Sequence, residues 1–287
     1  MELSDLVIFR AVVREGGIVR AARKLDRVPS SVTTRIQQLE ASIGVPLFTR
    51  ERQRLALSQG GVRLLEYADR MLSLSDEAKT AVADAAPSGV LRLGALESTT
   101  ASRLPAVLAA YHAAHPAMSV ELATGTNDAL TAAVLARRVH AAFVAEAPAD
   151  PRLASLPLFR ERLVIVSAKD HPPIGRPADV AGDAVLAFPD GCHYRRVLLR
   201  WIGDRRLPSL RLIELASYHA IVTSAAAGTG IALVPESVLA AVQHAEVRRH
   251  RPSRLRAEVV TPLVWRRDSD TAALAALRAL LLAKRRR

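Results

Sequence analysis

The side chains most capable of chemistry lie in two short segments in the second half of the chain. Cys192 and His193 are adjacent in GCHYRR, and Ser217, Tyr218 and His219 follow in ASYHAI. A thiolate activated by an imidazole is a nucleophile, but adjacency in sequence does not provide the geometry that a general base needs. We find no orienting acid or oxyanion loop to accompany them, so we expect a binding site and no enzyme activity.

A third polar segment, Glu97-Ser98-Thr99-Thr100, follows an apolar run and precedes a helix predicted to begin near Leu104. We expect a loop at the carboxyl end of a strand, which is where α/β sheets bind ligands. Hydroxyls beside a helix N-terminus suit a carboxylate or another anion, whereas Glu97 would attract a cationic group. Helix capping is the alternative role for each hydroxyl.

Cys192 is the only cysteine, which excludes an internal disulfide and a thiolate zinc cluster. A redox sensor is one interpretation of this thiol, and an inert buried thiol is the other. The GTG run at 228–230 lacks the spacing of a dinucleotide-binding fingerprint. We expect neither a metal nor another cofactor, and we interpret His219 as a hydrogen-bonded structural histidine.

These segments need a scaffold, and the pattern after residue 89 supplies one. Apolar strand-like runs alternate with helical segments, which predicts a parallel sheet with covering helices. The first series is VLRLGAL, LPAVLAAYHAA, SVELATG, ALTAAVLARR and HAAFVAE; the second opens at LVIVSA, includes IALVP, and is followed by a terminal helix. Two lobes joined near residues 162–166 and 262–266 would enclose a cleft.

The first 60 residues predict a compact helical unit with a basic ribbon. Apolar residues at helical spacing indicate a first helix that stops at Gly16, a second over about 18–25, and a third from Pro29 that ends at Gly44. Proline suits the first position of a helix. The segment TRERQRLALS then reads as a short, strand-like ribbon.

A single long amphipathic helix is predicted from about Gly60 to Ala85, because the segment lacks proline and its apolar residues keep a helical rhythm. Too little neighbouring sequence is available to cover its apolar face. We therefore predict that this face pairs with the same helix of a second subunit.

The formal net charge of +12 invites a polyanionic partner. Most of the excess lies after residue 88, where 27 basic residues face 17 acidic ones, so charge alone carries little weight. No apolar run approaches the roughly 20 residues of a membrane span, and the charged N-terminus is unlike a signal peptide. We expect a cytoplasmic protein that makes no membrane contact.

Residues 3–61 closely resemble the DNA-binding domain of LysR-type transcription regulators. Matching elements follow in order, including Phe9, the pair Ala21-Ala22, RIQQLE, GVPLF and Arg50. The later half is similar, more weakly, through LRLGALESTTASRLP, HAAFV and AAGTGIALVP. Two positions depart from the common pattern, because Gly17 and Val28 stand where hydroxyl residues usually cap the second and third helices.

The resemblance implies a multidomain α and α/β fold. A winged helix-turn-helix would occupy residues 1–59, a linker and dimerisation helix 60–88, and a two-lobed α/β effector domain, like periplasmic binding proteins, 89–287. Lobe I would comprise 89–163 with 264–287, and lobe II would comprise 164–263.

The resemblance also places the third helix in the major groove of DNA. Short hydroxyls there suit phosphate contact, Arg35 suits a bidentate contact to guanine, and arginines of the wing would add affinity. An exposed polar face that serves solubility is the alternative. The predicted DNA-binding residues are Ser30, Ser31, Thr33, Thr34, Arg35, Arg50, Arg52 and Arg54.

By the same resemblance, a small-molecule effector of unknown identity binds in the interlobe cleft. The predicted effector-binding residues are Ser98, Thr99, Thr126, Cys192, Tyr194, Ser217 and Tyr218.

Three function classes remain in view: a ligand-responsive transcription factor, a sequence-indifferent DNA-architectural protein, and a solute-binding protein whose helical front serves dimerisation. An architectural protein needs no two-lobed sensor, and an exported solute binder needs a signal peptide. The first class therefore explains most of the sequence. Its expected partners are double-stranded operator DNA, the effector, further copies of the chain as a dimer or tetramer, and RNA polymerase.

Overall fold

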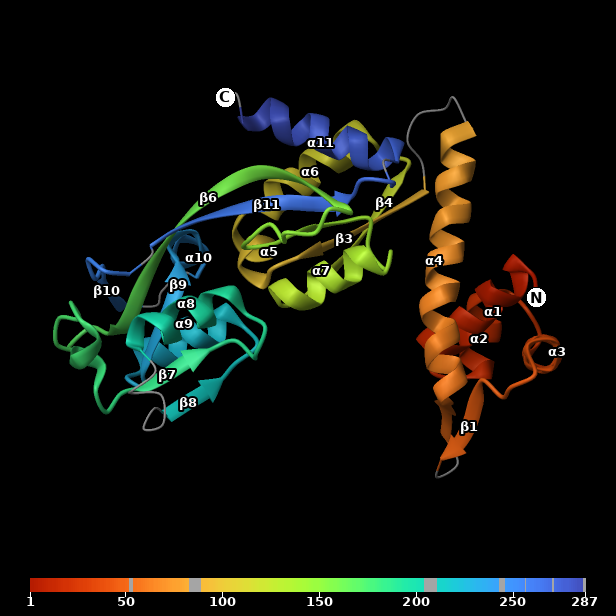
Figure 1. Ribbon diagram of the computed structural model, residues 1–287, viewed down its shortest axis with the longest axis horizontal. Helices are drawn as coiled ribbons and strands as arrows, with labels where there is room; N and C mark the ends of the chain where they lie inside the picture. The colour runs from red at the N-terminus through yellow and green to blue at the C-terminus, as the bar shows by residue number, and fades with distance from the viewer. Residues whose placement is uncertain are drawn as a thin grey trace. The chain divides into compact units, whose positions relative to one another are not determined.

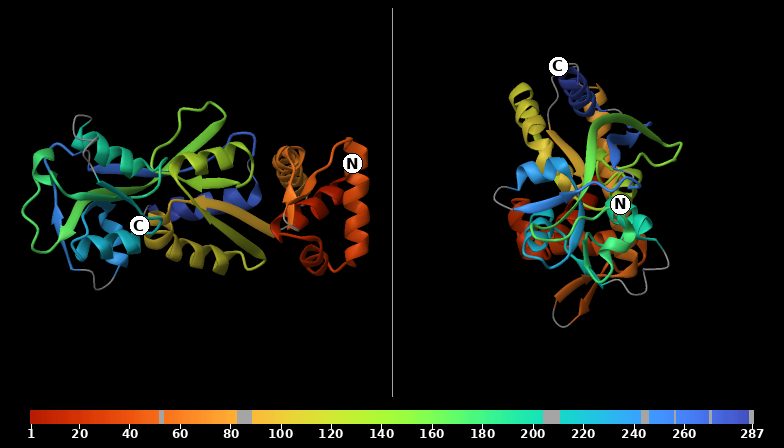
Figure 2. Two further views of the ribbon diagram at one scale, coloured as in Figure 1. Left: turned by 90° about the horizontal axis from the view of Figure 1, so that it is seen from below. Right: turned by 90° about the vertical axis from the view of Figure 1, so that its left-hand side faces the viewer.

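The computed structural model describes residues 1–51, 54–82, 89–203, 211–242, 246–255, 257–269 and 271–285 (Figures 1 and 2). Contacts divide the chain into two units, each with its own core. The first comprises Met1–Asp84 with Ala136–Arg138, and the second comprises Ala85–Leu135 with Val139–Arg287.

The first unit is a three-helix core followed by a hairpin and a long helix, as the periodicity predicts. Phe9, Val32, Leu39 and Leu47 are among the fully buried residues that join its helices. Gly44 ends the third helix at φ +83°, a conformation that favours glycine. The elements are α1 (Leu3–Arg14), α2 (Ile18–Lys24), α3 (Pro29–Ile43), β1 (Phe48–Glu51), β2 (Arg54–Leu57) and α4 (Gln59–Val82).

Helix α4 has two apolar faces rather than the single uncovered face that we expected. Ala68 and Leu72 are buried in the core of the first unit, where α4 packs against α1. Tyr67, Met71 and Leu74 form a second stripe that is exposed. Among the described residues, no helix has the length and apolarity to cross a membrane.

The second unit is built on one mixed sheet in the order β4-β3-β5-β11-β6-β9-β7-β8, with β10 paired to β6. Strand β3 runs parallel to β4 and β5, and β7 runs parallel to β8 and β9. The strands are β3 (Gly89–Ala95), β4 (Met118–Thr124), β5 (Ala141–Phe143), β6 (Leu153–Ala168), β7 (Ala184–Ala187), β8 (Arg211–Glu214), β9 (Ile231–Pro235), β10 (Val247–His250) and β11 (Glu258–Arg266).

Helices cover both faces of this sheet (Figure 1). In β5, Phe143 packs in the core that α6 and α11 share, whereas Ala142 packs in the core on the side of α7. The alternation follows from the two-residue period of a strand. The helices are α5 (Glu97–Ser102), α6 (Leu104–Ala114), α7 (Asn127–Leu135), a 3-10 turn η1 (Pro177–Val180), α8 (His193–Ile202), α9 (Tyr218–Ala226), α10 (Glu236–Ala241) and α11 (Ala272–Arg285).

Strands β6 and β11 join the two lobes of the second unit, and we call them the hinge strands. Strand β6 pairs with β11 up to Arg162 and with β9 from Leu163 onward. The register of β6 and β11 shifts where Pro262 faces Pro157, two residues that lack a backbone donor for the ladder. The sequence predicted a strand only from LVIVSA, so the first half of β6 was missed.

Candidate functional sites

The first turn of α3 carries polar side chains on its outer surface. Ser30 and Thr34 are exposed, and Ser31 and Thr33 are half-buried. The opposite face of the helix is buried in the core. The N-cap residue Val28 makes no side-chain cap hydrogen bond, as expected from its lack of a hydroxyl.

The threonine hydroxyls on α3 donate within their own helix. Thr33 Oγ1 donates to Pro29 O at 3.0 Å, and Thr34 Oγ1 donates to Ser30 O at 3.0 Å. Each hydroxyl then offers only its remaining lone pair outward, together with the methyl group. Phosphate contact by donation, which we expected of these hydroxyls, requires the internal bonds to break.

Arg35 is held by the start of α1. Its Nη2 donates to Asp5 Oδ1 at 2.8 Å and to Ser4 Oγ at 2.7 Å. Asp5 Oδ2 also accepts from the amide of Glu2 at 2.8 Å, so one carboxylate caps α1 and anchors α3. A bidentate contact of Arg35 with a base therefore competes with this ion pair.

The hairpin of β1 and β2 is the predicted basic ribbon. Its strands are antiparallel, with Arg50 opposite Leu55 and Glu51 opposite Arg54. Arg52 lies outside the described residues. The hairpin thus places the backbones of Arg50 and Arg54 on opposite strands of the same short ribbon.

Glu40, the last residue of the RIQQLE run, fixes the hairpin to α3. Its Oε1 accepts from the amides of Leu47 at 2.7 Å and Phe48 at 3.3 Å. Gly61 secures the other end of the hairpin, because a Cβ there would lie 2.1 Å from Leu47 O. The resemblance included Glu40, but its positioning role could not be read from the sequence.

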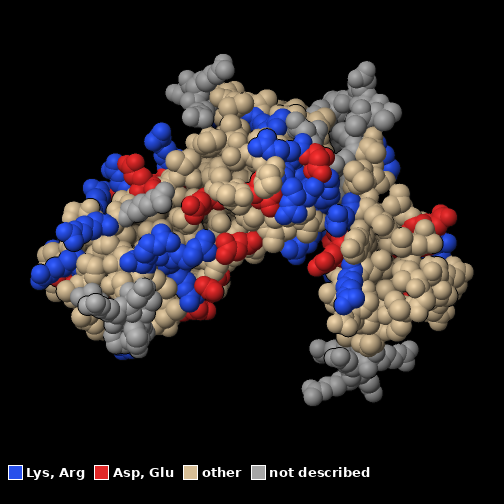
Figure 3. Space-filling model, in the orientation of Figure 1, with Lys and Arg blue, Asp and Glu red and all other residues tan. Residues whose placement is uncertain are grey.

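The basic residues of the second unit form no continuous stripe on the face shown in Figure 3, where acidic side chains are interspersed among them. Several pair locally, such as Arg92 with Glu121 at 3.2 Å and Arg195 with Glu214 at 2.6 Å. This distribution agrees with the expectation that the net charge of the chain does not by itself indicate a polyanionic partner.

A small cavity of about 20 Å³ lies between the two lobes of the second unit. It brings together five predicted effector-binding residues and others that were not predicted. Thr99 is buried outside this lining, and Ser217 caps α9 by accepting from the amide of Ala220 at 3.5 Å. The lining residues are Leu96, Glu97, Ser98, Gly125, Thr126, Ala145, Phe188, Cys192, His193, Tyr194 and Tyr218.

The segment that carries Ser98 is a short helix, α5, rather than the expected loop. Thr100 Oγ1 donates to Leu96 O at 3.1 Å, and Ser102 Oγ donates to Ser98 O at 2.6 Å. His219, which we interpreted as a hydrogen-bonded structural histidine, is exposed at the second position of α9.

Burial dominates the electrostatics of the cavity. It raises the pKa of Cys192 and of Tyr218, and it raises the pKa of Glu97 against a backbone hydrogen bond from Tyr218. A raised thiol pKa disfavours the reactive thiolate. His193 Nδ1 is paired with Glu146 Oε2 at 3.1 Å, so this imidazole nitrogen is directed to a carboxylate rather than to Cys192.

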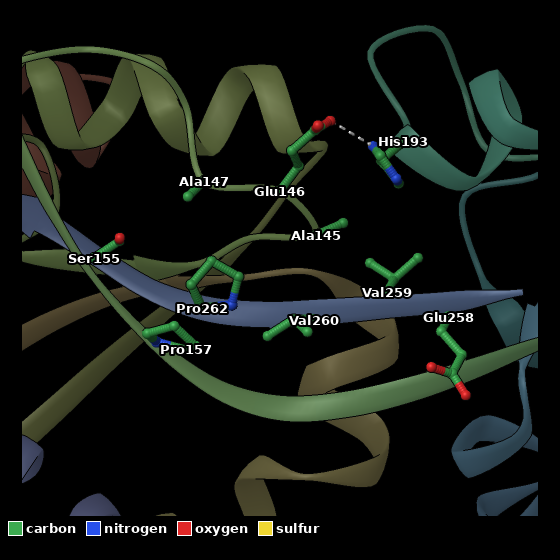
Figure 4. A pocket seen from close by; sticks show the side chains of 10 residues that line it. All are labelled: Ala145, Glu146, Ala147, Ser155, Pro157, His193, Glu258, Val259, Val260 and Pro262. Carbon is green, nitrogen blue, oxygen red and sulfur yellow. Dashed lines mark ion pairs between the residues drawn. The ribbon is translucent and has the colours of Figure 1, made fainter. Parts of the chain in front are cut away.

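A larger cavity of about 260 Å³ lies beside the hinge strands (Figure 4). Glu146 and His193 meet at its edge, and Glu258 is the other acidic residue of its lining. Backbone and apolar atoms of β6 and β11 form its floor. Nothing in the sequence signalled this cavity, because its walls come from strands paired over long distances.

Several contacts hold the lobes together around these cavities. Arg196 Nη1 donates to Asp128 Oδ2 at 3.0 Å across the cleft. Gly191, at φ +84°, approaches Thr126 so closely that a Cβ would lie 2.9 Å from its Oγ1.

Glu161 is a buried acid that sequence reasoning missed. It accepts from Arg103 Nε at 2.7 Å and from Ser237 Oγ at 2.7 Å, and thereby ties β6 to the segments around α6 and α10. Both hydrogen bonds satisfy a charge that would otherwise be costly to bury.

Two family models match the chain. Residues 3–62 match "Bacterial regulatory helix-turn-helix protein, lysR family", and residues 84–286 match "LysR substrate binding domain". The HTH-type transcriptional regulators YusT and GltR of Bacillus subtilis (strain 168) are 36% and 33% identical over 271 residues. These alignments cover 94% of this chain and 91% and 92% of the relatives. YusT is described as uncharacterized.

Solved structures share the whole fold. The crystal structure of CbnR, a LysR family transcriptional regulator, has a TM-score of 0.70 at 24% identity and covers 99% of both chains. Full-length CbnR has also been solved in complex with its target DNA, with a TM-score of 0.68 to this chain and the same 99% coverage of both.

Proposed function

The chain belongs to the LysR family of DNA-binding transcriptional regulators. From that premise we propose which of its residues bind DNA and which bind an effector. The α3 turn with Ser30, Ser31, Thr33 and Thr34 enters the major groove. The wing arginines, Arg50, Arg52 and Arg54, contact the DNA backbone and supply affinity rather than sequence choice.

The internal bonds of Thr33 and Thr34 carry the proposal for base reading. A hydroxyl that donates to its own helix presents an acceptor and a methyl group. The acceptor fits the amino groups of cytosine or adenine, and the methyl group fits the methyl group of thymine. Arg35 orients α3 in the free protein and reaches a base only when it leaves Asp5.

We propose that the exposed stripe of α4 pairs two subunits, so that two α3 helices reach successive major grooves of a partly symmetric operator. A tetramer would follow from contacts between such dimers.

The protein acts in the cytoplasm, where its operator and RNA polymerase are found.

The interlobe cavity is the proposed effector site, with Ser98, Thr126, Cys192, Tyr194 and Tyr218 around it. Thr99 and Ser217 support its walls. An effector alters promoter binding, DNA bending or polymerase contact only when it binds two lobe arrangements unequally.

Footprinting tests the DNA proposal. The full-length protein is placed on its own upstream region at near-physiological salt, with an unrelated fragment as competitor. We expect protection of paired sites about one helical turn apart. Displacement by the unrelated fragment as readily as by the upstream region would favour the sequence-indifferent architectural alternative.

A further inference from the structure

Four buried polar atoms in or beside the lining of the interlobe cavity lack a hydrogen bond of good geometry among the described residues. They are Glu97 Oε2, Ser98 Oγ, Tyr194 Oη and Thr261 Oγ1. Ser98, Tyr194 and Thr261 are only 2%, 3% and 0% exposed. Buried polar atoms in proteins are nearly always paired, so atoms left unpaired beside a cavity indicate a partner that binds there.

The three hydroxyls come from different parts of the fold and meet at one place. Ser98 belongs to α5 in the first lobe, Tyr194 to α8 in the second, and Thr261 to the hinge strand β11. Ser98 and Thr261 lie within reach of the Tyr194 hydroxyl, and weak hydrogen bonds between them oppose the rise in the pKa of Tyr194 that burial causes, so Glu97 Oε2 is the atom of this group that is left without any partner. Hydroxyls both donate and accept, so they do not by themselves select the charge of a ligand.

Glu97 does select a charge. Its Oε1 accepts from the amide of Tyr218 at 3.4 Å, whereas Oε2 is unpartnered. An ionised carboxylate only accepts hydrogen bonds, so its partner must be a donor. A ligand carboxylate beside it would be repelled.

Aromatic rings lie beside Glu97 in the lining of the cavity. The rings of Phe188 and Tyr218 lie 4.6 Å apart between centroids, and those of Tyr194 and Tyr218 lie 6.4 Å apart. All three residues line the cavity with Glu97, and the described lining contains no Lys or Arg. Aromatic faces and a carboxylate together attract organic cations.

We propose that the effector of this cleft carries a protonated amine, which binds between Glu97 and the aromatic rings of Phe188 and Tyr218 while the hydroxyls of Ser98 and Tyr194 receive its polar groups. This inference rests on the proposed effector site and specifies its ligand class. The cavity of about 20 Å³ has room for roughly one water molecule, so the amine enters when the lobes separate.

The test compares three small probes of one size, n-butylammonium, butyrate and butan-1-ol, at constant ionic strength. Ligand-observed NMR titration of the full-length protein gives their relative affinities. We expect n-butylammonium to bind most tightly. The nearly isosteric change Glu97→Gln should weaken its binding by about 10- to 100-fold, the range for a hydrogen bond to a charged group.

Two further variants isolate the charge. Glu97→Asp keeps the carboxylate and should retain the preference for the ammonium probe. Glu121→Gln is the matched control, because Glu121 is exposed on β4 and pairs only locally with Arg92; it should change nothing. Tighter binding of butyrate, unchanged affinity in Glu97→Gln, or no binding of the ammonium probe would overturn the inference. The operator footprint of the unliganded protein tests the regulator function separately.

Discussion

Arg35 and Asp5 are a pair in which each residue serves a different helix. The guanidinium lies on α3, the helix proposed to enter the major groove, and the carboxylate also caps α1. The Asp5 side chain is 10% exposed and that of Arg35 is 35% exposed. Such a pair is worth more than a fully solvated one but less than one in a dry core.

A double-mutant cycle measures this orienting role. Arg35→Gln and Asp5→Asn should each lower the free energy of unfolding by about 1–2 kcal/mol, with a coupling energy of about 1 kcal/mol. Urea unfolding of the full chain provides the measurement. Arg27→Gln, in the exposed turn before α3, is the control and should have little effect. Additive effects of Arg35 and Asp5 would show that the pair does not hold α3.

His250 makes the stability of the second unit depend on pH. Its Nδ1 accepts from the amide of Ile174 at 3.0 Å, and its Nε2 lies 2.7 Å from Ser167 Oγ. Burial, with lesser effects from His171 and Arg248, lowers its pKa to about 4 from the ordinary histidine value of 6.5. Between these values the unfolded chain binds a proton that the folded chain does not, so stability falls as pH falls.

The variant His250→Gln should remove this dependence. Between pH 7 and pH 5, the wild-type free energy of unfolding should fall by about 2 kcal/mol more than that of the variant. Fluorescence of Trp201 in α8 and Trp265 in β11, both in the second unit, follows urea unfolding at the two pH values. His112→Gln, exposed on α6, should keep the wild-type difference. Equal pH dependence in His250→Gln and wild type would refute the assignment.

At the scale of elements, α4 shows how one helix serves two surfaces. Its buried residues Ala68 and Leu72 attach it to the first unit, while Tyr67, Met71 and Leu74 follow the spacing i, i+4, i+7 on an exposed stripe. That spacing is typical of a helix that packs against a partner.

Leu74→Asp should therefore dissociate the proposed dimer. Leu74 is 54% exposed, so the subunit should stay folded while a charge enters the paired stripe. Analytical ultracentrifugation should show a smaller species, with circular dichroism unchanged. Glu66→Lys, a charge change at an exposed position of α4 that lies off the line of Tyr67, Met71 and Leu74, should leave the assembly intact. An undisturbed oligomer in Leu74→Asp would exclude this stripe as the interface.

The spacing of apolar residues in the sequence predicted those helices and strands that have a clear periodicity of their own. The helices of the first unit and the alternation of strands and helices after residue 89 were confirmed, because each shows its own periodicity. The first half of β6 was missed, since Pro157 and the charges of RER hide a strand that is stabilised by pairing with β11. Helix α5 was missed because its serines and threonines have low helix propensity.

At the scale of the whole molecule, the cleft depends on contacts that no local pattern encodes. Ser98 and Tyr194 were predicted from polar segments, yet Thr261 and Phe188 gave no such signal. Thr261 lies at the register shift of β11, and its place beside Tyr194 follows from the pairing of distant strands. Sequence therefore indicated part of the walls of the proposed site, but neither Phe188 nor the strand that joins the lobes.

The closed cleft must open before an effector of any class can enter, because its cavity of about 20 Å³ holds roughly one water molecule. Arg196 and Asp128 form an ion pair across the opening. Removing the pair with Arg196→Gln should raise the population of open lobes by up to about fivefold, the range for an exposed ion pair.

Amide hydrogen exchange in α7 and at the start of α8 measures that opening. Exchange should be faster in Arg196→Gln than in wild type at both sites. Arg176→Gln is the matched control, since it removes an exposed ion pair with Asp179 inside one lobe, and it should leave both sites unchanged. Equal exchange in the two variants would mean that the ion pair does not restrain the lobes, and that other contacts between them, such as the packing of Gly191 against Thr126 and the hydrogen bond from the amide of Tyr218 to Glu97, hold the cleft closed.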